Sequence, residues 1–272
     1  MKKILVLGGS GLVGSAIIKQ MCDRYDVYST YCHNSKYKRN DKSIKFDVDK
    51  PEFITDILNK VKPDIVISCL RGDYGNQLTV HEKAAQYLKN NGGMLYFFST
   101  TNVFDADASR SHNEDDIPKS CTDYGRYKIC CEERLKEIMN EKVCILRIPQ
   151  VWGKTCPRLV NLFKLNEKNG QVEVYPELEI NTNTDVMIAR QLGFIIENDL
   201  KGIFHLAAED TIKYDVLIRK ILKQANLKNI SIQNNYEEKG WFTLSSKRIN
   251  TFPPELRITN ERVIRAITNQ VD

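Results

Sequence analysis

Short apolar runs alternate along the first half of the chain with segments whose apolar residues recur at helical spacing. The runs predict strands at 4–7, 26–31, 43–46, 65–69 and 94–98, and the intervening segments predict helices at 15–22, 51–60 and 76–91. The first and last of these runs are apolar throughout, which is typical of strands buried on both faces. Strands that alternate with helices in this way predict a Rossmann-type α/β fold with a doubly wound parallel sheet.

The second half of the chain is less regular. Its pattern predicts helices at 123–139, 157–166, 185–197 and 214–226, strands at 143–147, 203–206 and 230–232, and then a polar tail. No repeat or long flexible linker interrupts it. We therefore predict a dinucleotide-binding domain over residues 1–150 and a substrate-binding lobe formed mostly by 151–272, with some elements returning to the sheet.

The composition of the chain argues against several classes of partner: nucleic acids, membranes and metal ions. The net charge of +5 comes from 40 basic and 35 acidic residues mixed along the chain, a pattern that does not favour nucleic acid. No apolar run approaches a membrane span and no signal peptide opens the chain, so we expect a cytoplasmic protein without membrane contacts. The eight cysteines lack metal-binding spacing, so we expect free thiols and no metal site. A homodimer is compatible with this composition, which does not specify the oligomeric state.

A glycine-rich segment follows the first predicted strand. It reads either as Gly8-x-x-Gly11-x-x-Gly14 or as Gly9-x-Gly11-x-x-Gly14, the general dinucleotide fingerprint. A strand, a glycine turn and a helix together present backbone N–H groups and a helix N-terminus to a pyrophosphate. The alternative is a tight turn without a ligand, but the position directly behind a buried-type strand favours a dinucleotide.

The segment after the second predicted strand bears on the choice of cofactor. NAD-binding units carry an acidic residue there, about 20 positions beyond the glycines, which holds the ribose 2′-hydroxyl. Residues 28–40 contain no acidic residue, and they include Thr30, His33 and Lys36. Hydroxyl groups and cations bind a 2′-phosphate, which a carboxylate would repel. A solvated basic loop is the alternative, and we favour NADP(H) over NAD(H).

Candidate catalytic residues follow the fifth predicted strand. Thr100 lies at its carboxyl end, where open α/β sheets bind ligands, and Tyr124 and Lys128 lie four residues apart on one face of the next helix. The lysine and a cationic nicotinamide would lower the phenol pKa from about 10. Tyr124 would then give a proton to a substrate oxygen that Thr100 also binds, while hydride arrives from NAD(P)H. The alternative is an exposed tyrosine with a lysine lying over its ring.

Together these motifs resemble the extended short-chain dehydrogenase/reductases, specifically the dTDP-4-dehydrorhamnose reductase-like group. The resemblance rests on the glycine motif, Lys62-Pro63-Asp64-Ile65-Val66-Ile67, Ser99-Thr100-x-x-Val103-Phe104-Asp105, Tyr124-x-x-x-Lys128 and Arg147-x-x-x-Val151-x-Gly153. It implies that Thr100, Tyr124 and Lys128 are catalytic and that the nicotinamide ribose is held by Tyr124 and Lys128. It also implies further cofactor contacts: Ser10, Gly11, Leu12 and Val13 for pyrophosphate, Asp47 and Val48 for adenine, and Cys69 and Leu70 for ribose.

Two departures from the group concern the substrate side. Thr101-Asn102 stands where the group usually has Asp-Tyr, and the segment 71–75 is shorter than the usual loop. We expect an NADPH-dependent oxidoreductase that reduces a keto group of a sugar nucleotide or related polar small molecule. Candidate substrate contacts are Arg71, Asn102, Trp152 and Arg158. The alternatives are an NAD-dependent nucleotide-sugar epimerase or dehydratase, and a non-catalytic NADP-binding regulatory subunit.

Overall fold

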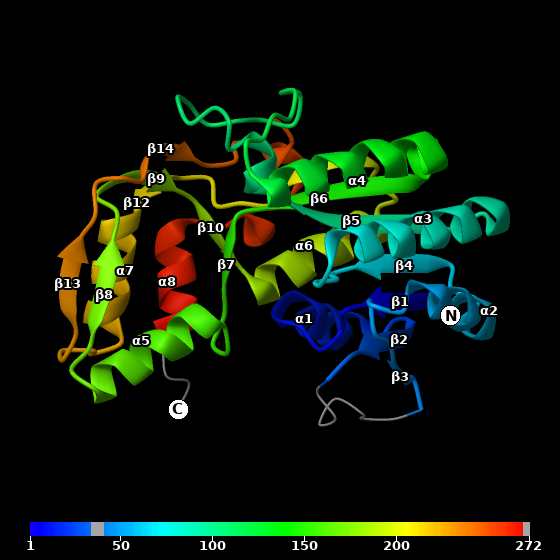
Figure 1. Cartoon of the computed structure of the whole chain (residues 1–272), viewed down its shortest axis with the longest axis horizontal. Helices are drawn as coiled ribbons and strands as arrows, with labels where there is room; N and C mark the ends of the chain where they lie inside the picture. Colours follow the sequence, from blue (N-terminus) through cyan, green and yellow to red (C-terminus); the bar gives the residue numbers. More distant parts are fainter. Residues whose placement is uncertain (34–40, 269–272) are drawn as a thin grey trace.

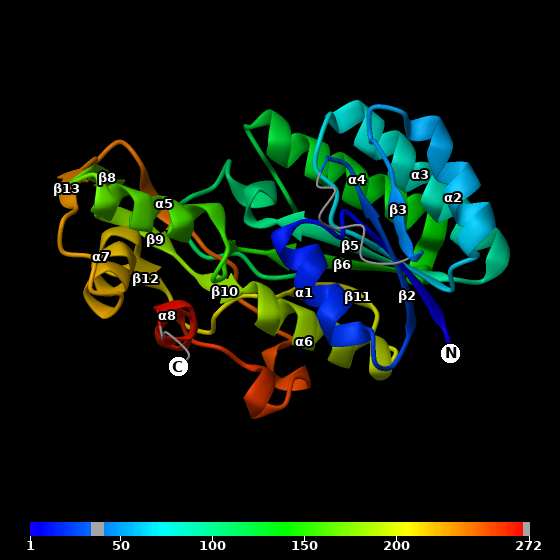
Figure 2. The same cartoon turned by 90° about the horizontal axis from the view of Figure 1, so that it is seen from below.

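A seven-stranded parallel sheet forms the centre of the molecule in the computed structural model, which describes residues 1–33 and 41–268. Its strands are β1 (Lys3–Leu7), β2 (Asp26–Tyr31), β3 (Ser43–Lys45), β4 (Ile65–Ser68), β5 (Met94–Thr100), β6 (Val143–Ile148) and β11 (Gly202–His205). They lie in the order β11-β6-β5-β4-β1-β2-β3. Figure 1 shows this order from β6 to β3, and β11 is labelled in Figure 2. The chain leaves β1 toward one edge and later returns to β4 on its other side, so a ligand crevice is expected at the carboxyl ends of these two strands. The predicted Rossmann-type fold is confirmed.

Both faces of the sheet are covered by helices. Ile4 and Val6 of β1 pack into one apolar cluster, and Leu5 and Leu7 pack into another, because successive side chains of a strand point to opposite faces. The first cluster includes side chains of α1 (Leu12–Met21) and α6 (Asp185–Glu197). The second includes side chains of α2 (Ile54–Val61), α3 (Tyr74–Asn91) and α4 (Asp123–Met139) (Figures 1 and 2). This double burial is why β1 reads as a continuous apolar run.

Most of the second half of the chain lies beside the carboxyl ends of the large sheet (Figure 1). Its helices are α5 (Pro157–Glu167), α7 (Tyr214–Gln224) and α8 (Asn260–Thr268). Its short strands are β7 (Gln150–Trp152), β8 (Gln171–Val174), β9 (Glu177–Ile180), β10 (Thr182–Thr184), β12 (Ile212–Lys213), β13 (Ser231–Asn234) and β14 (Lys239–Phe242). They form three small sheets, β10-β7, β12-β9-β14 and β13-β8. No helix of the described residues is long and apolar enough to cross a membrane.

The predicted polar tail is wrong, because the described part of it ends in a packed helix. In α8 the side chains of Val263, Ile264 and Ile267 are buried in the first apolar cluster. Their spacing matches one face of a helix, but charged residues between them lower the average hydrophobicity of the segment. Apart from β13, which the predicted strand at 230–232 overlaps, the strands of the small sheets were also missed, since two to four residues are too few to show a period.

Candidate active site

The glycine segment makes a turn that admits almost no side chain. Gly8 has φ +80°, and a Cβ added to it would lie 2.6 Å from the carbonyl oxygen of Cys69. A Cβ on Gly14 would lie 2.4 Å from the carbonyl oxygen of Gly8. Helix α1 then begins behind Gly11 without a side-chain cap and without an acidic residue in its first turn. An uncapped, acid-free helix N-terminus behind a tight turn fits the pyrophosphate of a dinucleotide.

Gly14→Ala is expected to weaken binding of a nicotinamide dinucleotide by about tenfold or more, because the new methyl group pushes the turn away from the helix N-terminus. Gly193→Ala in α6 is the matched control, since its Cβ would meet no atom nearer than 3.6 Å. Isothermal titration with NADPH measures both variants. Equal affinity of Gly14→Ala and wild type would show that the turn does not hold the cofactor.

The other predicted adenine and ribose contacts come from strand ends at the same edge. The Cys69 backbone packs against Gly8, and both Cys69 and Leu70 are half-buried. Asp47 is half-buried and accepts a hydrogen bond from the Asp49 N–H, while Val48 is buried. The structure therefore places Cys69 and Leu70 against the glycine turn, whereas the cofactor contacts of Asp47 and Val48 stay predictions.

The three residues predicted to bind a 2′-phosphate, Thr30, His33 and Lys36, differ in their surroundings. The Thr30 side chain is buried, and its hydroxyl oxygen accepts the Gly8 N–H at 3.0 Å, so it holds the glycine turn instead of facing solvent. His33 is exposed at the end of the segment after β2. Lys36 lies outside the described residues. Of the predicted contacts, only His33 is described with a side chain open to a phosphate.

Thr100 and Tyr124 meet where β5 ends and α4 begins. Thr100 is the last residue of β5, and its side chain lies close enough to the Tyr124 phenol to favour a lower pKa of that phenol. The Thr122 hydroxyl oxygen caps α4 by accepting the Gly125 N–H at 3.2 Å, which fixes the first turn that carries Tyr124. A Cβ on Gly125 would lie 2.3 Å from the carbonyl oxygen of Asn102, so the helix start and the segment after β5 are in direct contact.

Lys128 lies one turn further along α4 and is buried. Its Nζ donates to the carbonyl oxygen of Phe98 at 2.9 Å and lies 4.5 Å from the centre of the Phe97 ring. Burial lowers the pKa of Lys128 to about 8, against smaller opposing effects of Cys131, Cys69 and Glu132. The side chain thus brings an ammonium group beneath the carboxyl end of β5.

The sequence predicts that Lys128 and a cationic nicotinamide together lower the Tyr124 pKa, but Lys128 is not among the main influences on that pKa in this structure. Burial is the largest effect and raises the pKa of Tyr124, while the nearby Thr100 side chain and the Arg71 charge partly oppose it. The physical reason is that the Lys128 ammonium is directed to the Phe98 carbonyl. A phenol with a raised pKa stays protonated at neutral pH, which is the form that gives a proton to a carbonyl oxygen.

Lys128→Met is expected to stabilise the fold while removing activity. The folded state disfavours the ammonium, so below pH 8 the lysine costs on the order of 1–3 kcal/mol after allowing for its hydrogen bond. This cost shrinks as pH rises from about 8 toward the unfolded value of 10.5. Urea unfolding at pH 7 and pH 10 checks the sign. A variant less stable than wild type at pH 7 would contradict the account.

Two of the predicted substrate contacts adjoin the catalytic pair. Arg71 is exposed, and its charge acts on Tyr124, Lys128 and Cys69. Asn102 is half-buried and hydrogen-bonds to Thr100. Tyr74, which the sequence did not single out, lies on the same side, with its ring centre 6.1 Å from that of Tyr124. No residue pattern marked Tyr74, because its position depends on the short segment before α3.

The other two predicted substrate contacts lie away from the catalytic pair. Arg158 is exposed in the first turn of α5, and its charge acts on Tyr214 of the same lobe. Trp152 is fully buried and its indole N–H donates to Gln150, so the substrate contact predicted for it is wrong. Within residues 1–33 and 41–268, no group of three or more His, Cys, Asp or Glu side chains could hold a metal ion.

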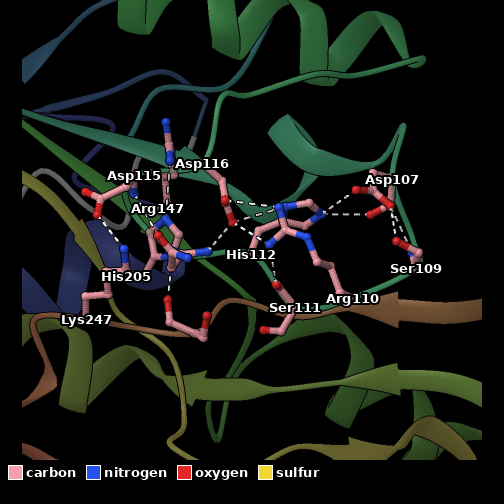
Figure 3. A network of polar contacts seen from close by, with 12 residues as sticks. Asp107, Ser109, Arg110, Ser111, His112, Asp115, Asp116, Arg147, His205 and Lys247 are labelled. Carbon is pink, nitrogen blue, oxygen red and sulfur yellow. Dashed lines mark hydrogen bonds and ion pairs between the residues drawn. The ribbon is translucent and has the colours of Figure 1, made fainter.

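A buried polar network supports the strand and helix that carry the catalytic residues. Arg147 of β6 donates two hydrogen bonds to Glu132 of α4, at 3.0 and 2.7 Å, and both side chains are buried. The Ser99 hydroxyl, next to Thr100, donates to the same carboxylate at 2.5 Å. Figure 3 shows Arg147 pointing toward His205 of β11, whose Nε2 lies 3.3 Å from a guanidinium nitrogen. The network joins β5, β6, β11 and α4.

The segment before α4 forms an ion pair and hydrogen bonds with the last third of the chain. Lys247 forms an ion pair with Asp115 at 2.7 Å (Figure 3). The Lys247 N–H donates to the Glu114 carboxylate. The Glu114 carboxylate also accepts the backbone N–H of His205 at 3.2 Å. Sequence reasoning missed this support, because its partners lie about a hundred residues apart and share no local pattern.

Comparisons with known proteins match this chain to one family model and to several dTDP-4-dehydrorhamnose reductases. The family model described as the RmlD substrate binding domain matches residues 1–240. No curated protein matches the chain. The dTDP-4-dehydrorhamnose reductase of Yersinia enterocolitica superposes with a TM-score of 0.82 at 18% identity, over 98% of this chain and 99% of that chain. The reductase of Bacillus anthracis, in complex with NADP, superposes with a TM-score of 0.81 at 17% identity, over 97% and 98%.

A related enzyme of different activity is similar to the same degree. The dTDP-glucose 4,6-dehydratase of Bacillus anthracis, in complex with NAD, superposes with a TM-score of 0.83 at 11% identity, over 98% of this chain and 95% of that chain. At such identities the structural likeness establishes a shared fold and leaves the reaction to the residues of the site.

Proposed function

Because the chain belongs to the family described as the RmlD substrate binding domain, we propose that it is an NADPH-dependent oxidoreductase that reduces a keto group of a sugar nucleotide or related polar metabolite. The observation that carries the proposal is the meeting of Thr100, Tyr124 and Lys128 at one end of β5. That end lies at the carboxyl edge of the sheet, as does the glycine turn after β1.

The chemistry divides between the cofactor and the chain. A bound nicotinamide dinucleotide would supply the hydride, held by Ser10–Val13, Asp47, Val48, Cys69 and Leu70. Tyr124, protonated because burial raises its pKa, gives its proton to the substrate oxygen as that oxygen becomes an alkoxide. Thr100 binds the same oxygen, the Arg71 charge favours the phenolate that remains, and Lys128 would hold the nicotinamide ribose.

The residues after Thr100 argue against a dehydratase. Dehydration requires an additional acid and base beside the keto carbon. Thr101 is buried and its hydroxyl donates to the Ile148 carbonyl at 3.3 Å, and Asn102 carries an amide that does not titrate. A reductase needs neither group. The NAD complex of the dehydratase therefore gives no reason to prefer that reaction here.

We further propose that residues 1–150 bind the dinucleotide and that most of 151–272 binds the substrate. The second half also supplies β11 at one edge of the large sheet and α6, which packs beside α1. The substrate would then lie between the small sheets and the carboxyl ends of β4 and β5.

NADPH is expected to bind about tenfold or more tightly than NADH, because residues 32–40, which follow β2, include basic residues and no acidic residue that would repel a 2′-phosphate. Quenching of tryptophan fluorescence, titrated with each cofactor, measures the two dissociation constants. The advantage of NADPH should fall as salt is added, since it depends on charge. Tighter binding of NADH would contradict the cofactor preference while leaving the reductase assignment open to the turnover test.

A further inference from the structure

The short segment that follows β4 packs against the glycine turn on one side and against the chain after β3 on the other. A Cβ added to Gly8 would lie 2.6 Å from the carbonyl oxygen of Cys69. A Cβ added to Gly72, whose φ is +139°, would overlap a methyl carbon of Val48. Arg71 therefore leaves the backbone between a contact with the glycine turn and a contact with a residue that we predict to bind adenine.

The backbone of this segment is fixed, whereas the Arg71 side chain is not bound to the protein. The buried Gln77 side chain donates to the carbonyl oxygen of Gly72 at 2.7 Å. The Asp73 side chain caps α3 by accepting the Asn76 N–H at 2.9 Å. Arg71 itself is exposed, and in the part of the chain that the structure describes it has no hydrogen-bond or ion-pair partner. All N–H donors of its guanidinium are thus available to a ligand.

The Arg71 charge acts on groups at the carboxyl ends of the central strands. Burial has the largest effect on the pKa values of Tyr124, Lys128 and Cys69, and the charge of Arg71 acts to lower all three. Two of these groups belong to α4 and the third directly follows β4. The guanidinium therefore lies on the side of the segment that faces the crevice between the glycine turn and the catalytic pair.

The glycine turn offers N–H groups to a pyrophosphate but no cation. Residues 8–15 contain no lysine or arginine. The Gly11 N–H already donates to the Gly8 carbonyl oxygen at 3.0 Å, so the turn offers mainly the first N–H groups of α1, which have no partner within the helix. Each phosphate of a dinucleotide is negatively charged, and a guanidinium binds phosphate oxygens through paired, charge-assisted hydrogen bonds.

We propose that Arg71 is a cofactor-binding residue whose guanidinium binds the pyrophosphate of the dinucleotide together with the glycine turn. The inference rests on the dinucleotide site of the proposed function, and it assigns Arg71 to the cofactor instead of the substrate. Because NADPH and NADH share the pyrophosphate, Arg71 raises the affinity for both. The choice between the two cofactors is left to the residues that follow β2.

The test measures the binding of NADPH, NADH and ADP-ribose by isothermal titration. ADP-ribose carries the pyrophosphate and lacks the nicotinamide, so it separates a contact with one from a contact with the other. The variants are Arg71→Met, which removes the charge, and Arg71→Lys, which keeps the charge and removes the paired donors. Arg134→Met is the matched control, since the exposed Arg134 guanidinium pairs with Glu82 and Glu137.

Arg71→Met should weaken all three ligands by about tenfold and leave the ratio of the NADPH and NADH affinities unchanged. Its binding should also depend less on salt than that of wild type, and Arg71→Lys should recover only part of the loss. Arg134→Met should bind like wild type. Urea unfolding of Arg71→Met should match that of wild type, because the side chain has no partner in the described part of the chain.

Unchanged binding of ADP-ribose by Arg71→Met would overturn the inference, and so would a loss confined to NADPH, which would place Arg71 at the 2′-phosphate. A rise in the KM for a ketone with unchanged cofactor affinity would return Arg71 to the substrate and overturn it too. The expected loss of affinity would support the inference even if wild type reduced no ketone. No binding of any of the three ligands by wild type would count against the inference and the proposed function together.

Discussion

Tyr124→Phe should lower turnover by about a thousandfold or more while leaving the affinity for NADPH nearly unchanged. The phenol is the group that gives a proton to the substrate oxygen, and removing a general acid costs two to four powers of ten in rate, which places about a thousandfold within the expected range. Its ring remains in place in the variant, so the cofactor meets the same surface. Steady-state NADPH oxidation and a cofactor titration separate the two effects.

Tyr127→Phe is the control for this variant, because Tyr127 lies one residue short of Lys128 and belongs to the same turn of α4. Its ring stacks on Tyr74 with 4.7 Å between centres, and its side chain is buried. Removal of its hydroxyl should leave turnover close to that of wild type. Full activity of Tyr124→Phe, or a comparable loss in Tyr127→Phe, would show that the proton comes from another group.

Glu132→Gln should lower the free energy of unfolding by about 3–5 kcal/mol, since it leaves the buried Arg147 guanidinium without a counter-charge. Glu132 accepts both Arg147 hydrogen bonds and the one from Ser99, so the change also loosens the end of β5. Urea unfolding measures the loss. The cost is large because both charges are removed from water in the folded protein.

Two further variants test whether this loss of stability comes from the unpaired buried charge. Arg134→Met removes an exposed ion pair with Glu82 and should cost no more than about 1 kcal/mol. The double variant Glu132→Leu with Arg147→Met should recover much of the stability lost by Glu132→Gln, since no charge is left buried. A loss for Glu132→Gln as small as that for Arg134→Met would mean that the buried pair does not matter to the fold.

The large sheet could be predicted from the sequence because each of its central strands is buried on both faces. Strand β1 is apolar at every buried position, and the glycine turn after it leaves room for no side chain at Gly8 or Gly14. These local requirements appear directly as residue types. The small sheets and α8 could not be predicted in the same way, since their burial depends on partners from distant parts of the chain.

In the candidate site too, some features could be predicted from the local sequence, and others depend on contacts between distant residues. Thr100, Tyr124 and Lys128 were identified from their spacing, and the structure brings them together at the end of β5. Their electrostatics could not be deduced, because the direction of the Lys128 ammonium depends on where the Phe98 carbonyl lies. Thr30 was misjudged for a similar reason, since its bond to the Gly8 N–H joins residues of two different strand ends. Contacts between distant parts of the chain decide which hydrogen-bonding and charged groups of a side chain remain free to bind a ligand.

The most direct test of the reductase assignment is to follow the transferred hydrogen. The protein would be incubated with NADPH deuterated at C4 of the nicotinamide and with a 4-keto sugar nucleotide, and the product would be analysed by mass spectrometry and NMR. We predict one deuterium on the carbon that carries the new hydroxyl with wild type, and none with Tyr124→Phe over the same time. NADPH binding by wild type without deuterium transfer to any keto-sugar nucleotide or simpler ketone would contradict the assignment and favour a binding role.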